Sequence, residues 1–133
     1  MKSRGTGTAL NKDYLVRPPD AGARYAERRC VPRYPFIAIA EVFEPVSRIS
    51  LVGRTSEISL KGCYIDTQNP MPSNSVIQIR ITRDKGTFET WGRVAYAQDG
   101  LGMGIAFIRM APDQELVIAD WVAELSGERA HAT

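Results

Sequence analysis

The sequence has few of the side chains from which most catalytic and metal-binding sites are built. Its single histidine, His131, lies close to the C-terminal end, so a Ser-His-Asp or Cys-His site would lack a base. Its two cysteines, Cys30 and Cys63, are too far apart for a Cys-x-x-Cys pair, and we expect two free thiols. The sequence therefore predicts no enzyme, no metal site and no cofactor.

Long apolar runs are also missing. No stretch approaches the roughly 18–20 apolar residues that cross a bilayer, and the start of the sequence has no apolar block of the kind found in a secretory signal. We therefore expect a cytoplasmic protein without membrane insertion. With 133 residues, of which 44% are hydrophobic, the chain is long enough for one domain and a flexible extension.

Positive charge is concentrated at one end of the chain. Residues 1–35 carry eight Lys or Arg against three Asp or Glu, a net charge of +5, whereas the other 98 residues carry nine against twelve, a net charge of −3. This asymmetry indicates an anionic partner that meets the N-terminal segment rather than the whole surface.

Short apolar segments separated by turn residues fill the middle of the chain. In the clearest segment, Ile77, Ile79 and Ile81 alternate with polar residues, which is typical of a strand with one buried face. Several such segments at spacings of about ten residues, with no helix between them, predict an antiparallel β-barrel. We expect six strands, at residues 36–43, 48–59, 62–67, 75–83, 88–97 and 102–110.

One helix is expected after the strands, at about residues 113–126. Pro112 and Asp113 are typical of a helix start, and Gly127 of a helix end. The apolar residues that recur at helical spacing are Leu116, Val117, Trp121 and Leu125. The predicted fold is therefore mostly β: a flexible N-terminal arm (1–26), a six-stranded antiparallel β-barrel with one C-terminal helix (27–126) and a disordered tail (127–133).

The segment Glu27–Pro35, which reads ERRCVPRYP, places three arginines on a backbone that cannot form a helix. Its prolines fix φ and remove two backbone donors. In an extended chain Arg29 and Arg33 lie roughly 13 Å apart on one side, a separation that suits a ligand with two anionic or hydrogen-bonding ends. Arg28 would point the other way or fold over the ligand. A solvated basic linker is the alternative interpretation.

A second segment, SEISLKGCYID at residues 56–66, has the composition of a strand that runs into a turn. Alternation predicts that Glu57 and Ser59 lie on the same face and offer a carboxylate and a hydroxyl together. Gly62 permits a positive φ or the close approach of another group. Taken alone, this segment is more typical of an ordinary strand and turn.

Taken together, the two segments resemble the PilZ domain family, whose members are receptors for the bacterial second messenger cyclic di-GMP. The family pattern is RxxxR, often preceded by another Arg, just before a six-stranded barrel, and then (D/N)xSxxG on that barrel. RCVPR at Arg29–Arg33, preceded by Arg28, and EISLKG at Glu57–Gly62 match these two motifs. The later residues 91–107 also resemble the closing strands of the family, and the resemblance covers about residues 27–125.

The resemblance implies a ligand and its binding residues. Arg28, Arg29 and Arg33 are expected to bind phosphate oxygens and guanine edges of cyclic di-GMP, and the side formed by Glu57, Ser59 and Gly62 is expected to support a guanine. It also implies that the arm changes position on binding and signals to a protein effector.

Glu57 stands where the family has Asp or Asn, which places the head group one methylene further out. Because some family members with altered motifs bind no nucleotide, a PilZ-like scaffold that binds only a protein partner is an alternative. A barrel that binds single-stranded nucleic acid through its basic arm is another.

Overall fold

The computed structural model describes residues 31–84 and 86–132. The chain divides into two units, residues 1–32 and 33–133, and the barrel and helix belong to the second. The expected flexible arm at residues 1–26, as well as Arg28 and Arg29, lies outside the described residues.

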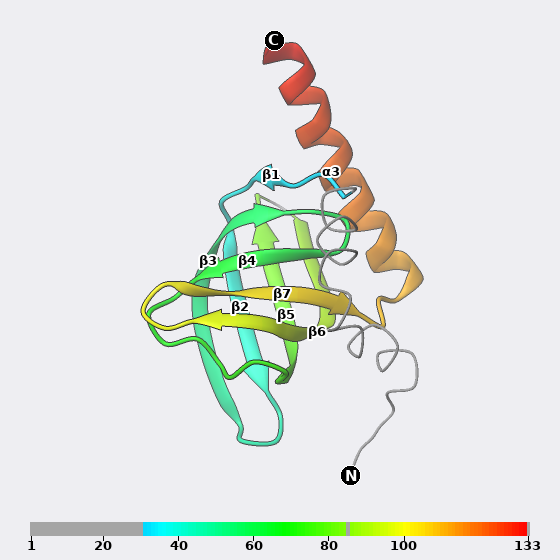
Figure 1. The fold of residues 1–133 in the computed structure, drawn as a ribbon. Helices are drawn as coiled ribbons and strands as arrows, with labels where there is room; N and C mark the ends of the chain where they lie inside the picture. Colours follow the sequence, from blue (N-terminus) through cyan, green and yellow to red (C-terminus); the bar gives the residue numbers. More distant parts are fainter. Residues whose placement is uncertain (1–30, 85, 133) are drawn as a thin grey trace, which may run out of the picture. The chain divides into compact units, whose positions relative to one another are not determined.

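The second unit is built around a closed antiparallel barrel (Figure 1). Its sheet has the order β1-β3-β2-β5-β6-β7-β4, and the additional pairing of β3 with β4 closes it. Closure leaves no open sheet edge among β2–β7, which is how a barrel of short strands avoids unpaired backbone groups. The strands are β1 (Tyr34–Pro35), β2 (Ile39–Glu44), β3 (Ile49–Ile58), β4 (Gly62–Asp66), β5 (Val76–Arg83), β6 (Gly86–Gln98) and β7 (Gly102–Ile108).

The barrel interior follows the predicted alternation. In β5 the three isoleucines at 77, 79 and 81 are at most 2% exposed, whereas Gln78 and Arg80 between them are exposed. The largest fully buried side chains are Phe88, Ile58, Ile65, Ile77, Ile79, Ile81, Met103, Ile118, Val42, Val94 and Thr55. Burial of these aliphatic and aromatic groups is the main force that holds the strands in register.

The first predicted strand, at residues 36–43, corresponds to β2, which begins three residues later at Ile39, and the two-residue strand β1 precedes it. The residues between them stay bonded to β3, because Phe36 N donates to Ser56 O (3.0 Å) and Thr55 N donates to Ala38 O (2.9 Å). The buried hydroxyl of Thr55 donates to the Phe36 carbonyl oxygen at 2.8 Å. At this point the Thr55 hydroxyl, rather than a backbone N–H group, donates to the Phe36 carbonyl oxygen. The regular hydrogen bonding between the strands is therefore interrupted.

The C-terminal helix, α3 (Pro112–Ala132), packs on the barrel at β1 and β6 (Figure 1). It buries Ile118, Trp121 and Leu125, and the Trp121 ring centroid lies 5.6 Å from that of Phe36. Leu116, which the sequence placed on the buried stripe, is 68% exposed. That assignment is wrong because the face that reaches the barrel runs through Ile118 instead.

The predicted end of the helix at Gly127 is also wrong, and with it the tail predicted to follow. The helix continues through Gly127 to Ala132, where Glu, Arg and Ala are good helix formers that offset the cost of one glycine. The other predictions of fold, a six-stranded antiparallel barrel and a helix that begins near Pro112, are confirmed. Within the described residues, no helix is long and apolar enough to cross a membrane.

Candidate ligand-binding site

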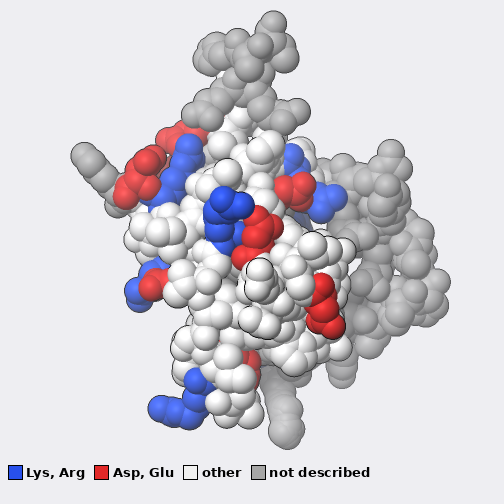
Figure 2. Space-filling model, turned by 90° about the vertical axis from the view of Figure 1, so that its left-hand side faces the viewer, with Lys and Arg blue, Asp and Glu red and all other residues white. Residues whose placement is uncertain are grey.

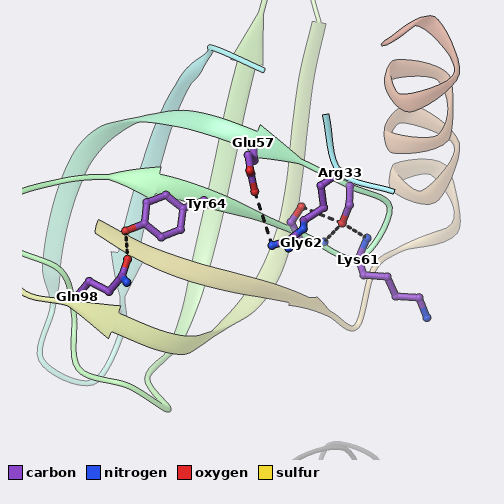
Figure 3. A network of polar contacts seen from close by, with 7 residues as sticks. Arg33, Glu57, Lys61, Gly62, Tyr64 and Gln98 are labelled. Carbon is purple, nitrogen blue, oxygen red and sulfur yellow. Dashed lines mark hydrogen bonds and ion pairs between the residues drawn. The ribbon is translucent and has the colours of Figure 1, made fainter. Parts of the chain in front are cut away.

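The pairing of β1 with β3 brings the two sequence motifs together. Tyr34 lies opposite Ile58 and Pro35 opposite Glu57, so Arg33, the residue before β1, lies beside the end of β3. The guanidinium Nη1 of Arg33 is 3.6 Å from Oε1 of Glu57, and both side chains are about half exposed, at 51% and 48%. Figure 3 shows this ion pair beside the turn that joins β3 to β4. Arg33 is thus a cation at the surface. The backbone pairing of β1 with β3 places it beside Glu57, although the two residues are far apart in the sequence.

Ser59 lies in that turn, where its side chain is 5% exposed. The hydroxyl oxygen accepts hydrogen bonds from the backbone N–H groups of Lys61 and Gly62, each at 3.1 Å. The backbone N–H of Ser59 donates in turn to Gly62 O at 2.8 Å. Ser59 therefore fixes the shape of the turn.

This arrangement corrects one expectation from the sequence. Glu57 and Ser59 were predicted to present a carboxylate and a hydroxyl together on one face. In the structure Glu57 is exposed, whereas Ser59 is buried and bonded within the turn. Strand β3 ends at Ile58, so Ser59 lies in the turn, outside the strand alternation on which the prediction depended.

Gly62 meets the expectation of close approach. A Cβ atom added at this position would lie 2.1 Å from the backbone oxygen of Ile105. No real side chain accepts such a contact, so only glycine lets β4 approach β7 here. Gly62 also pairs directly with Ala106 of β7. The glycine of the second motif thus holds the turn against the neighbouring strand.

The structure adds three residues that the sequence reasoning missed: Tyr64, Tyr96 and Gln98. Tyr64 lies directly opposite Glu57, and its hydroxyl donates to Oε1 of Gln98 at 2.5 Å (Figure 3). The rings of Tyr64 and Tyr96 have centroids 6.1 Å apart. Alternation in residues 62–67 indicates that Tyr64 faces outward, but only the strand register shows that it adjoins Glu57.

The environment of Tyr64 keeps it in the protonated form. Burial is the main cause that raises the pKa of the Tyr64 hydroxyl above its ordinary value, and the neighbouring Tyr96 and Asp66 raise this pKa further. Both effects disfavour a phenolate. Tyr64 therefore stays a hydrogen-bond donor up to a higher pH than an ordinary tyrosine does.

Charges on this part of the surface are mixed. Arg54 and Asp66 form an ion pair at 3.5 Å between β3 and β4, a short distance along the barrel from Arg33 and Glu57. Figure 2 shows that charged side chains on the viewed face lie in small groups, most of which contain both signs, with uncharged surface between them. Among the described residues no cluster of His, Cys, Asp or Glu could hold a metal ion. The site is suited to binding an organic molecule through arginine, carboxylate and ring contacts.

Two of the six predicted site residues, Arg28 and Arg29, lie outside the described residues. The other four, Arg33, Glu57, Ser59 and Gly62, come together at one end of β3. Their separate roles toward a ligand stay predictions. Arg33 and Glu57 offer exposed polar groups, whereas Ser59 and Gly62 shape the backbone beneath them.

Comparison with known proteins gives a consistent picture. The family model described as PilZ domain matches residues 27–124. Among curated proteins none matches the chain.

Several solved structures share the fold. One is the PilZ domain of YcgR from Escherichia coli with c-di-GMP, at 14% identity and a TM-score of 0.65, covering 79% of this chain and 96% of that one. Another is the PilZ domain of CeSA from a cellulose-synthesizing bacterium, at 23% identity and a TM-score of 0.58, covering 71% and 98%. A third is the Bacillus subtilis inhibitor of motility, at 10% identity and a TM-score of 0.59, covering 71% and 49%.

Proposed function

Because the chain belongs to the PilZ domain family, we propose that it is a receptor domain for cyclic di-GMP, a binding module without catalytic activity. One observation supports this most strongly. The β1–β3 pairing places Arg33, the last arginine of RxxxR, 3.6 Å from Glu57, the first residue of the second motif. Two segments that the sequence separates by more than twenty residues thus form one surface.

The groups on this surface match the ligand chemically. Cyclic di-GMP has two phosphodiesters and two guanines. The planar guanidinium of Arg33 suits phosphate oxygens, or the O6 and N7 acceptors of guanine. The Glu57 carboxylate suits the N1–H and N2–H donors of guanine. Because both side chains are about half exposed, a ligand reaches them without opening the barrel.

We further propose that Arg28 and Arg29 contact the same ligand. They precede β1 by a few residues, and the three arginines would together neutralise two phosphodiester charges. Ordering of the segment before β1 on binding would then signal to a protein effector, because ligand contacts made by that segment favour one of its positions over others.

A second candidate function is supported by the same ion pair. Arg33 and Glu57 form an ion pair with each other, and Glu57 replaces the Asp or Asn of the family pattern. A PilZ-like scaffold that binds only a protein partner would retain such a pair. Its binding to that partner would be insensitive to cyclic di-GMP and to loss of Arg33.

Isothermal titration calorimetry of the intact chain with cyclic di-GMP distinguishes the two candidates. Saturable heat from the wild type, with a Kd about 10- to 150-fold higher in Arg33→Ala, supports the receptor. A matched control is Arg48→Ala, since Arg48 is exposed and lies at the other end of β3, roughly 25–30 Å away by strand rise. No heat from a chain whose fold is verified by circular dichroism would refute the receptor function.

A further inference from the structure

Two tyrosine rings adjoin the proposed ligand site on the outer face of the barrel. Glu57 of β3 lies opposite Tyr64 of β4, Tyr64 lies opposite Gly104 of β7, and Gly104 lies opposite Tyr96 of β6. Residues that are directly opposite in a sheet share a face. Glu57, Tyr64 and Tyr96 therefore form one row across four strands.

Glycines in β7 let both rings lie against the sheet. A Cβ atom at Gly104 would be 2.3 Å from Cε1 of Tyr96, and one at Gly102 would be 2.7 Å from Cε2 of Tyr64. The rings thus occupy the space that two side chains of β7 would otherwise fill. Because the two rings lie over the backbone of β7, the ring faces that point away from the barrel form an aromatic surface.

This aromatic surface is held in place. The Tyr64 hydroxyl donates to Oε1 of Gln98 at 2.5 Å, which fixes the position of the ring (Figure 3). The planes of Tyr64 and Tyr96 are inclined by 35° with centroids 6.1 Å apart, a separation typical of contacting rings. Both side chains are only partly buried, so one side of the pair is accessible.

We propose that Tyr64 and Tyr96 form a stacking platform for one guanine base of the ligand, with Glu57 at its hydrogen-bonding edge. This inference rests on the proposed receptor function. Aromatic rings stack on any base, so the platform supplies affinity. Glu57 supplies the choice of base: its carboxylate only accepts hydrogen bonds, guanine offers two donors on that edge, and adenine presents an unprotonated ring nitrogen in place of one of them.

The distances are suitable for this arrangement. Directly opposite residues have Cβ atoms about 4.5–5.5 Å apart, and the Tyr64 ring extends from its Cβ over Gly102 toward Gln98, so a base stacked on this ring meets Glu57 with the edge that points back along β4. The same carboxylate lies 3.6 Å from Arg33. A nucleotide stacked on Tyr64 would therefore place its base edge at Glu57 and its phosphate toward the arginines.

The experiment combines calorimetry and NMR on the full chain, with cyclic di-GMP and cyclic di-AMP as the probes. Tyr64→Leu and Tyr96→Leu each remove a ring and should weaken cyclic di-GMP binding by about 5- to 150-fold. Tyr64→Phe keeps the ring and should bind within about threefold of the wild type. Trp91→Leu is the matched control, since Trp91 is an aromatic residue of β6 that pairs with Gln78 and Ile108, away from this row.

A second readout reports contact directly. In the wild-type complex, NOEs should connect guanine protons with ring protons of Tyr64 and Tyr96, and cyclic di-AMP should bind at least about tenfold more weakly. If the leucine variants do not fold, these NOEs decide the question.

The outcomes distinguish failure of the stacking platform from failure of the receptor function. If Arg33→Ala weakens binding but the leucine variants bind like the wild type, or the NOEs are missing, the platform is wrong and the receptor function stands. If the wild type binds no cyclic di-GMP, both are wrong.

Discussion

Arg33→Ala is predicted to weaken ligand binding strongly while it leaves the stability of the fold almost unchanged. The Arg33–Glu57 ion pair spans 3.6 Å with both partners about half exposed. Exposed pairs of this kind contribute at most about 1 kcal/mol, because solvent screens the charges. The free energy of unfolding should therefore fall by less than about 1 kcal/mol.

The effect on binding should be larger. A hydrogen bond from arginine to an anionic or strongly polar acceptor contributes about 1.5–3 kcal/mol, so its loss should raise Kd by about 10- to 150-fold. The cost of separating Arg33 from Glu57 before binding is at most the small value above, so it does not cancel this contribution.

Two assays measure the two quantities. Urea denaturation followed by circular dichroism gives the free energy of unfolding, and calorimetry with cyclic di-GMP gives Kd, each for wild type, Arg33→Ala and the control Arg48→Ala. The reasoning would be refuted if Arg33→Ala bound the ligand like the wild type. It would equally fail if the substitution lost several kcal/mol of stability, because Arg33 would then be a structural residue.

Four further outcomes are expected. Ser59→Ala removes the acceptor of two backbone N–H groups in the turn and should lower the free energy of unfolding, measured by urea denaturation, by about 1–3 kcal/mol. Ser59→Thr keeps the hydroxyl and should retain most of the stability, and equal stability of both variants would contradict the role of the hydroxyl. Gly62→Ala places a Cβ 2.1 Å from a β7 carbonyl oxygen and should destabilise the fold by at least about 2 kcal/mol, which a thermal melt would reveal, and an unchanged melting temperature would argue against the close approach. Glu57→Asp retracts the carboxylate by one methylene and should tighten cyclic di-GMP binding by about fivefold, as expected for one better aligned hydrogen bond of about 1 kcal/mol; weaker binding on calorimetry would show that the longer side chain is the better fit. Burial raises the pKa of the Cys63 thiol far above its ordinary value, so in a Cys30→Ser variant at pH 8 a thiol reagent should label the folded protein about a hundredfold more slowly than the unfolded protein, and equal rates would show that Cys63 is accessible.

The sequence predicted the barrel well because its strand signals are local. In β5 the isoleucines recur at every second position, and this spacing alone predicts which face is buried. The predicted and observed bounds of this strand, 75–83 and Val76–Arg83, agree to within one residue. The helix start at Pro112 is also a local signal, since proline fits the first turn of a helix.

The features that the sequence did not predict depend on long-range packing. The predicted and observed buried faces of the helix share Trp121 and Leu125, and contact of Trp121 with Phe36 and Phe88 turns Ile118 toward the barrel in place of Leu116. The neighbours of Tyr64 depend on the register of β4 with β3 and β7. No local pattern gives that register.

In the candidate site, too, local sequence patterns predicted some features, and the three-dimensional structure determined the others. The two motifs identified Arg33, Glu57, Ser59 and Gly62 as a group, and the structure brings these four together. Their exposure was not predictable, because the end of β3 at Ile58 and the hydrogen bonds of the turn decide that Glu57 is exposed and Ser59 buried. Sequence patterns thus indicated which residues meet, and local geometry determined what each can offer a ligand.

The most direct test is an NMR titration of the ¹⁵N-labelled chain with cyclic di-GMP. The proposed function predicts saturable shifts that are largest at Arg33, at Glu57 and in the turn from Ser59 to Gly62, where the two motifs meet. Absence of shifts, or shifts confined to the far end of the barrel around Arg48, would contradict it.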